Sequence, residues 1–155
     1  MAEKGKWTLD TLRNAVASGE VTQVLTAFPD YYGRLVGKRI MGGYFIEHVV
    51  DDGIHACDYL LTVDMEMDPV PGYRFSSWET GYGDFHVVPD WQTLRVASWL
   101  EGTALVLCDL HDEEDGSPID VAPRTILRRQ IDRAAASGYR INAGSELEFY
   151  LFNDA

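Results

Sequence analysis

The chain contains little cysteine, no long apolar segment and few cations, and each shortage argues against a class of protein. Only two cysteines, Cys57 and Cys108, occur among 155 residues, which predicts free thiols in a reducing compartment rather than a disulfide framework. No apolar run approaches ~18 residues, the length that a membrane-spanning helix needs. The first residues also lack the apolar stretch of a secretory signal. We therefore expect a cytoplasmic protein with no membrane partner.

Positive charge is scarce as well. The sequence has 13 Lys and Arg residues against 25 Asp and Glu residues, a formal net charge of -12. Nucleic acids and anionic membrane surfaces both require a basic footprint, so neither is expected as a partner. A hydrophobic content of 46% is sufficient for a real core, and the length suits one domain or one small domain plus the start of another.

Periodicity and turn residues predict a chain that begins and ends with helix and strand and has mostly strands between. A fold of class α+β is therefore expected. A change of composition at residues 111–118 is the best candidate boundary between domains. We expect helices at 8–18, 42–50 and 122–137, and strands at 21–28, 34–40, 64–68, 84–88, 103–110 and 144–152.

The last expected strand carries a pair of carboxylates. Glu146 and Glu148 would share one face about 7 Å apart, with Leu147, Phe149 and Leu151 on the other face. Two like charges this close raise each other's pKa unless a cation intervenes. The pair is therefore predicted to form half of a Mg²⁺ or Mn²⁺ site, which prefers about six oxygen ligands. The competing interpretation is a solvated strand face.

Other motifs carry less information. The cationic stretch at 33–39 lacks the spacing of a phosphate-binding loop and is better explained as a solvated strand edge. The acidic stretch at 109–116 does not match a calcium loop and predicts a polar turn. Residues 74–85 are rich in aromatics and glycine, and two interpretations stay open, a packed loop or a loop that reaches into a pocket. No ligand role is assigned to the four histidines, which show no close pair spacing: His48, His55, His86 and His111.

Taken together, these stretches resemble the N-terminal part of the glutamine synthetase family. The most specific element is Gly-x-Glu-x-Glu-Phe, which stands one helix after a Pro-Arg pair. The resemblance covers nearly the whole chain and is carried by Arg34-Leu35-Val36-Gly37-Lys38-Arg39, by Gly81-Tyr82-Gly83-Asp84-Phe85 with Pro89-Asp90, Trp99 and Glu101-Gly102-Thr103-Ala104, and by Ala122-Pro123-Arg124 with Gly144-Ser145-Glu146-Leu147-Glu148-Phe149.

The resemblance implies an N-terminal helix at 1–19, a β-grasp domain at 20–110 and the start of the catalytic domain at 111–155, truncated after its first helix and strand. It implies ATP-dependent ligation of glutamate to ammonia or an amine through a γ-glutamyl phosphate. Glu146 and Glu148 match two glutamates that hold Mg²⁺ or Mn²⁺ in the family, and ATP is the co-substrate. Family members form homo-oligomeric rings in which the β-grasp domain closes the active site of the adjacent subunit.

Two departures from the family pattern bear on function. Arg74-Phe75-Ser76-Ser77 stands where the family has an aspartate of the ammonium site, and only Asp84 matches a second acidic position of that loop. A larger amine, such as a polyamine or ethanolamine, is therefore expected in place of ammonia. The other metal, glutamate and nucleotide ligands are expected beyond residue 155, so the isolated chain is predicted to be inactive. The alternatives are a stand-alone β-grasp module that docks on full-length synthetase subunits, and a small acidic metal-binding protein.

Overall fold

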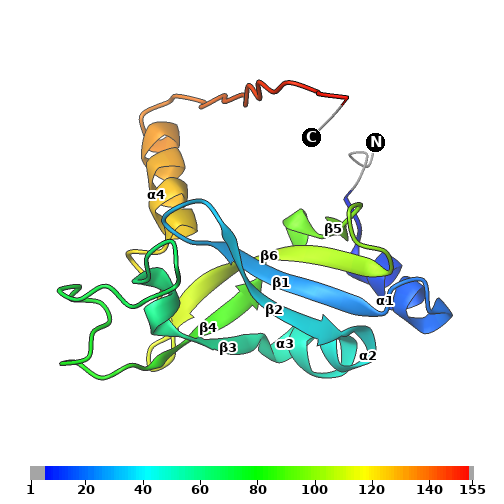
Figure 1. Ribbon diagram of the computed structural model, residues 1–155, viewed down its shortest axis with the longest axis horizontal. Coiled ribbons are helices and arrows are strands. Elements are labelled where there is room, and N and C mark those ends of the chain that lie inside the picture. Colours follow the sequence, from blue (N-terminus) through cyan, green and yellow to red (C-terminus); the bar gives the residue numbers. More distant parts are fainter. Residues whose placement is uncertain (1–5, 154–155) are drawn as a thin grey trace.

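The computed structural model describes residues 6–153 and contains one mixed sheet with helices on both of its faces (Figure 1). The strands are β1 (Gln23–Pro29), β2 (Leu35–Met41), β3 (Ile54–Cys57), β4 (Asp84–Pro89), β5 (Arg95–Val96) and β6 (Thr103–Asp112). The helices are α1 (Leu9–Ser18), α2 (Gly42–Tyr44), the π-helical η1 (Phe45–Val49), α3 (Val50–Asp52), the 3-10 turns η2 (Asp58–Leu61) and η3 (Trp91–Thr93), and α4 (Pro123–Ala136).

The first helix forms where its cap residues predict it. The Thr8 hydroxyl accepts a hydrogen bond from the backbone N–H of Thr11 at 3.1 Å, and Gly19 ends α1 with a left-handed φ of 79°. Leu12 and Ala15 are buried on its inner face. The predicted helix at 8–18 is therefore confirmed.

The sheet is organised around β6. Its strand order is β2-β1-β6-β4-β3, and β5 pairs with the beginning of β6. β1 is parallel to β6 and antiparallel to β2, whereas β4 is antiparallel to both β6 and β3. The strand predicted at 103–110 is thus the central one, and it continues to Asp112. The predicted class, α+β, is confirmed.

Alternate residues of β6 face two different environments. Val106, Cys108 and Leu110 point into the main core, where Phe28 and Phe85 meet edge to face with ring centroids 5.4 Å apart. Leu105 belongs to a smaller cluster with Ala27 and Ala97, and Asp109 holds α4 through ion pairs. Between residues 6 and 153, no helix is both long and apolar enough to cross a membrane.

The strand predicted at 64–68 is wrong, because these residues form a turn. The Asp64 Oδ1 atom accepts hydrogen bonds from the backbone N–H groups of Glu66 at 2.9 Å and Asp68 at 3.0 Å. Met67 lies in the left-handed region with φ 71°. An aspartate side chain that accepts hydrogen bonds from the backbone N–H groups two and four residues ahead competes with strand pairing. The alternation of acidic and apolar residues gave no sign of this competition.

The strand predicted at 144–152 is also wrong. These residues are extended and unpaired, and Figure 1 shows them leaving the end of α4 and running clear of the sheet. Leu147 is 85% exposed and Leu151 is 89% exposed, so no apolar face is covered. A strand requires a neighbour to satisfy its backbone groups, and none of the strands within residues 6–153 pairs with this segment.

The two cysteines are free thiols that differ in accessibility, and this sets a first testable expectation. Cys108 is fully buried, and its burial raises its pKa to about 12, whereas Cys57 is partly exposed. Because the thiolate is the nucleophile, iodoacetamide at pH 8 should label Cys57 alone in the folded chain and both cysteines in guanidinium chloride. Peptide mass spectrometry checks this, and labelling of native Cys108 at the rate of Cys57 would contradict it.

Candidate functional site

The long connection between β3 and β4, residues 58–83, is tied down at its base. The Ser76 hydroxyl donates to Asp58 Oδ1 at 2.6 Å, and the Asp58 backbone N–H donates to the Gly83 carbonyl at 2.9 Å. Ser76 and Ser77 are buried, with 1% and 6% of their surface exposed. Ser76 therefore closes the base of the loop, and Ser77 bonds to Thr80 beside it.

The same connection also presents aromatic side chains to solvent. Tyr82 packs edge to face between Tyr59 and Trp78, with ring centroids 5.9 Å and 6.2 Å away. Trp78 is nevertheless 83% exposed. Asp84 follows as the first residue of β4, exposed and directly opposite Cys57 of β3. The loop thus combines an ordered base with a partly exposed aromatic cluster, and the carboxylate of Asp84 follows directly after it.

The two predicted metal ligands lie on the unpaired terminal segment. Glu146 and Glu148 are both exposed, and within residues 6–153 neither carboxylate has a hydrogen-bond or ion-pair partner. Carboxylate oxygens are the donors that Mg²⁺ and Mn²⁺ prefer, so the pair fits part of such a site. Across the described residues, no group of three or more His, Cys, Asp or Glu side chains is placed to hold a metal ion.

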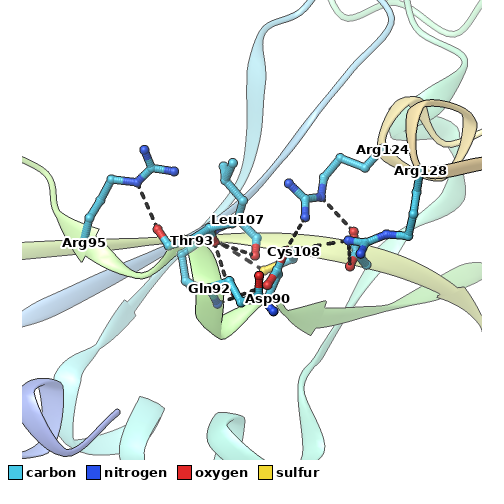
Figure 2. A network of polar contacts seen from close by, with 10 residues as sticks. Asp90, Gln92, Thr93, Arg95, Leu107, Cys108, Arg124 and Arg128 are labelled. Atoms are coloured by element: carbon cyan, nitrogen blue, oxygen red, sulfur yellow. Dashed lines mark hydrogen bonds and ion pairs between the residues drawn. The ribbon is translucent and has the colours of Figure 1, made fainter. Parts of the chain in front are cut away.

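A polar network fastens the start of α4 to the sheet (Figure 2). Arg124 donates from Nε to Asp109 Oδ1 at 2.7 Å and from Nη2 to Asp90 Oδ2 at 2.6 Å. Arg128 adds a bond from Nη2 to Asp109 Oδ2 at 3.0 Å. Asp90 directly follows β4, Asp109 lies within the neighbouring strand β6, and one guanidinium bridges the two carboxylates. The network therefore fixes where the chain leaves the sheet toward Glu146 and Glu148.

The electrostatics of this network favour the charged form of Arg124. Burial alone lowers the pKa of Arg124, but hydrogen bonds and charge from Asp109 and Asp90 outweigh burial and leave the pKa above its ordinary value. Asp90 also caps η3 by accepting from the Gln92 backbone N–H at 3.1 Å, and the Thr93 hydroxyl accepts from the Leu107 backbone N–H at 2.8 Å. Figure 2 shows both contacts beside the arginines. Sequence reasoning missed the network because its members lie far apart in the chain.

Sequence reasoning also missed a row of histidines. His55, His86 and His111 occupy directly opposite positions on β3, β4 and β6. They are separated by 31 and 25 positions in the chain, so no local spacing could have revealed the row. Only the register of the three strands brings them together.

Comparison with solved structures defines the class of fold. A solved structure of a GmaS/ADP complex matches this chain with a TM-score of 0.60 and 21% identity, over 81% of this chain and 26% of that one. At that identity the likeness concerns the fold alone. The sheet and helices described above therefore have the same fold as the matching part of that structure.

Sequence comparison identifies the family. The family model for the glutamine synthetase catalytic domain matches residues 120–155. Gamma-glutamylethanolamide synthetase GlnA4 of Streptomyces coelicolor is 49% identical over 146 residues, which are 94% of this chain and 31% of that protein. Glutamate–isopropylamine ligase of a Pseudomonas species is 33% identical over 155 residues, which are 100% of this chain and 34% of that protein. The chain belongs to the glutamine synthetase family and spans about a third of the length of these curated relatives.

Proposed function

We propose that this chain is the N-terminal portion of an ATP-dependent ligase that joins the side-chain carboxylate of glutamate to an amine through a γ-glutamyl phosphate. The observation that carries the proposal is 49% identity, over 94% of this chain, to an enzyme named for making a glutamyl–ethanolamine bond. A second relative, 33% identical, is named for ligating glutamate to isopropylamine. Both names denote an organic amine rather than ammonia, which agrees with the altered ammonium-site pattern at residues 74–77.

In this proposal Glu146 and Glu148 hold Mg²⁺ or Mn²⁺ together with ligands from elsewhere in the enzyme. The ion, when bound, would offset negative charge as phosphate is transferred from ATP. The terminal segment is unpaired within the described residues, so the two carboxylates need further strands to position them. The isolated chain is accordingly expected to have no turnover.

The loop at 58–83 is proposed to form one wall of the amine site, with Asp84 at its foot as the group that attracts a cationic amine. Ser76 and Ser77 are buried and bonded within the loop, so the exposed contacts come from Trp78 and Tyr82. Faces of Trp and Tyr accept both alkyl groups and ammonium ions. Exposed Trp78 also suits contact with a neighbouring subunit in a homo-oligomeric ring.

A chimera tests the proposal. Residues 1–155 replace the corresponding third of the Streptomyces coelicolor relative, and phosphate release is measured with ATP, glutamate and ethanolamine. We expect turnover from the chimera and at least 100-fold less turnover from its Glu148→Ala variant. Without this ligand, the metal ion would no longer be held in position to offset the negative charge of the transferred phosphate. Glu114→Ala, which changes an exposed turn residue, is the matched control. An inactive parent chimera, or one indifferent to Glu148→Ala, would contradict the proposal.

The stand-alone interaction module remains a second candidate, favoured by one observation. Residues between Leu12 and Ala122 bury a continuous core of their own, including Phe28, Phe45 and Phe85, which does not depend on the terminal segment. Such a unit could dock on full-length synthetase subunits. Co-elution of the 155-residue chain with the full-length relative in size-exclusion chromatography would support this function, and separate elution at high concentration would count against it.

A further inference from the structure

We infer that the histidine row of β3, β4 and β6 is a second metal site, separate from the glutamate pair, that takes a divalent transition-metal ion such as Zn²⁺. His55 and His86 are the two principal ligands. His111, the next member of the row, is the nearest source of a third. The inference does not depend on the proposed ligase activity.

The strand register places the three side chains on one face of the sheet. His55 lies directly opposite His86, and His86 lies directly opposite His111. Directly opposite residues of an antiparallel pair project to the same side, with Cβ atoms about 4.5–5.5 Å apart. Their chain neighbours Ala56, Phe85 and Leu110 are buried on the other side. The row is therefore on the face away from the main core, where the His55 side chain is 53% exposed.

Each ring is oriented by an oxygen acceptor. His55 Nδ1 lies 2.8 Å from Glu113 Oε1, His111 Nδ1 lies 2.9 Å from the Gly116 carbonyl, and His86 Nε2 contacts the Asp52 carbonyl. Carboxylate and carbonyl oxygens only accept hydrogen bonds, so the nitrogen facing each of them carries the proton. The opposite nitrogen of each neutral ring then carries a lone pair. Metal-binding histidines show this same arrangement of an outer oxygen that fixes the tautomer.

The spacing of the first two rings suits one ion. The ring centroids of His55 and His86 are 5.1 Å apart, with planes inclined at 53°. Two imidazoles bound to a tetrahedral ion at about 2.0–2.1 Å per Zn–N bond have centroids about 5 Å apart. The observed separation of the two rings is therefore compatible with both of them binding the same ion.

The site is incomplete as the side chains stand. No group of three or more potential ligands is already placed for a metal within residues 6–153, so His111 has to rotate or water has to fill the remaining positions. Imidazole ligands favour Zn²⁺, Cu²⁺ and Ni²⁺ over the hard cations that carboxylates prefer. We therefore expect Zn²⁺ to bind in the micromolar range, more weakly than at four-ligand structural sites.

Zinc titration of the 155-residue chain tests the inference. Isothermal calorimetry with ZnSO₄ at pH 7.5 should give one site whose affinity falls at least tenfold in His55→Gln and in His86→Gln. His48→Gln, an exposed histidine outside the row, and the double variant Glu146→Gln/Glu148→Gln are matched controls that should bind as the parent does.

A measurement on the unmutated chain covers the case in which a variant fails to fold. Long-range ¹H–¹⁵N spectra of the imidazoles should show zinc-dependent shifts of the His55 and His86 rings. No zinc binding up to millimolar concentration would overturn the inference. Unchanged affinity in both row variants would overturn it as well, and so would loss of binding in His48→Gln or in the glutamate double variant alone.

Discussion

Replacing Gly37 with alanine should lower the free energy of unfolding by about 3 kcal/mol or more. Gly37 lies opposite Ala27 in the β1–β2 ladder. A Cβ atom built at Gly37 would lie 1.9 Å from the Thr26 carbonyl oxygen and 2.9 Å from Ala27 Cα. Both are backbone atoms of the paired strand and cannot rotate away. The two strands would have to separate, and β1 also borders the central strand.

Gly43→Ala is the matched control for this substitution. Gly43 lies in α2, and a Cβ atom at this position meets nothing within 4 Å. Alanine is favoured over glycine in a helix by up to about 1 kcal/mol, so this variant should be as stable as the parent or slightly more stable. Urea unfolding followed by tryptophan fluorescence measures both changes. A Gly37→Ala chain with the parent's unfolding midpoint would show that the hairpin tolerates the extra carbon.

Replacing Arg124 with methionine should cost about 2–4 kcal/mol of stability and release α4 from the sheet. Arg124 bridges Asp90 and Asp109, whose side chains are only 19% and 27% exposed. Without the guanidinium, two neighbouring carboxylates would remain half-buried, and only Arg128 would stay to neutralise them. Apolar packing contributes little to hold the helix, since Thr125 is its one buried residue.

Arg129→Met is the matched control for Arg124→Met, because Arg129 pairs with Asp120 at the surface, where the two side chains are 53% and 76% exposed. Exposed pairs are worth about 0–1 kcal/mol. Hydrogen exchange should show faster exchange of the α4 amides in Arg124→Met and little change in Arg129→Met. Adding Asp109→Asn to Arg124→Met should recover part of the loss by removing one unpaired charge. Equal effects of the two arginine substitutions would refute the bridging role.

Local signals were sufficient for much of the fold. The threonine cap and the glycine stop of α1, the Pro123 start of α4 and the apolar run of β6 each act within a few residues, so the sequence alone predicted these elements. The segment at 64–68 was misjudged because one aspartate side chain satisfies the backbone there. The alternation of Glu146 and Glu148 with apolar residues indicates a strand only where a neighbouring strand exists.

The candidate sites depended more strongly on tertiary structure. The Arg124 bridge joins residues 34 and 15 positions apart, and the histidine row depends on the register of β3, β4 and β6. Neither can be derived from spacing along the chain, because spacing carries no information about which strands become neighbours. The metal role of Glu146 and Glu148 stays a prediction that rests on the pairing of two carboxylates and on family resemblance, and the role of Asp84 stays one that rests on the resemblance alone.

The parallel pairing of β1 with β6 has a consequence for biosynthesis. Gln23 pairs with Thr103 and Ala27 pairs with Leu107. β1 therefore cannot form this ladder until β6, 80 residues later in the chain, has been synthesised. A ribosome that has translated only the β1–β2 hairpin therefore exposes one unsatisfied strand edge and the apolar side of Phe28. Such non-local pairing slows folding and exposes nascent chains to aggregation. The edge of β1 is covered only once β6, through Asp112, has been made.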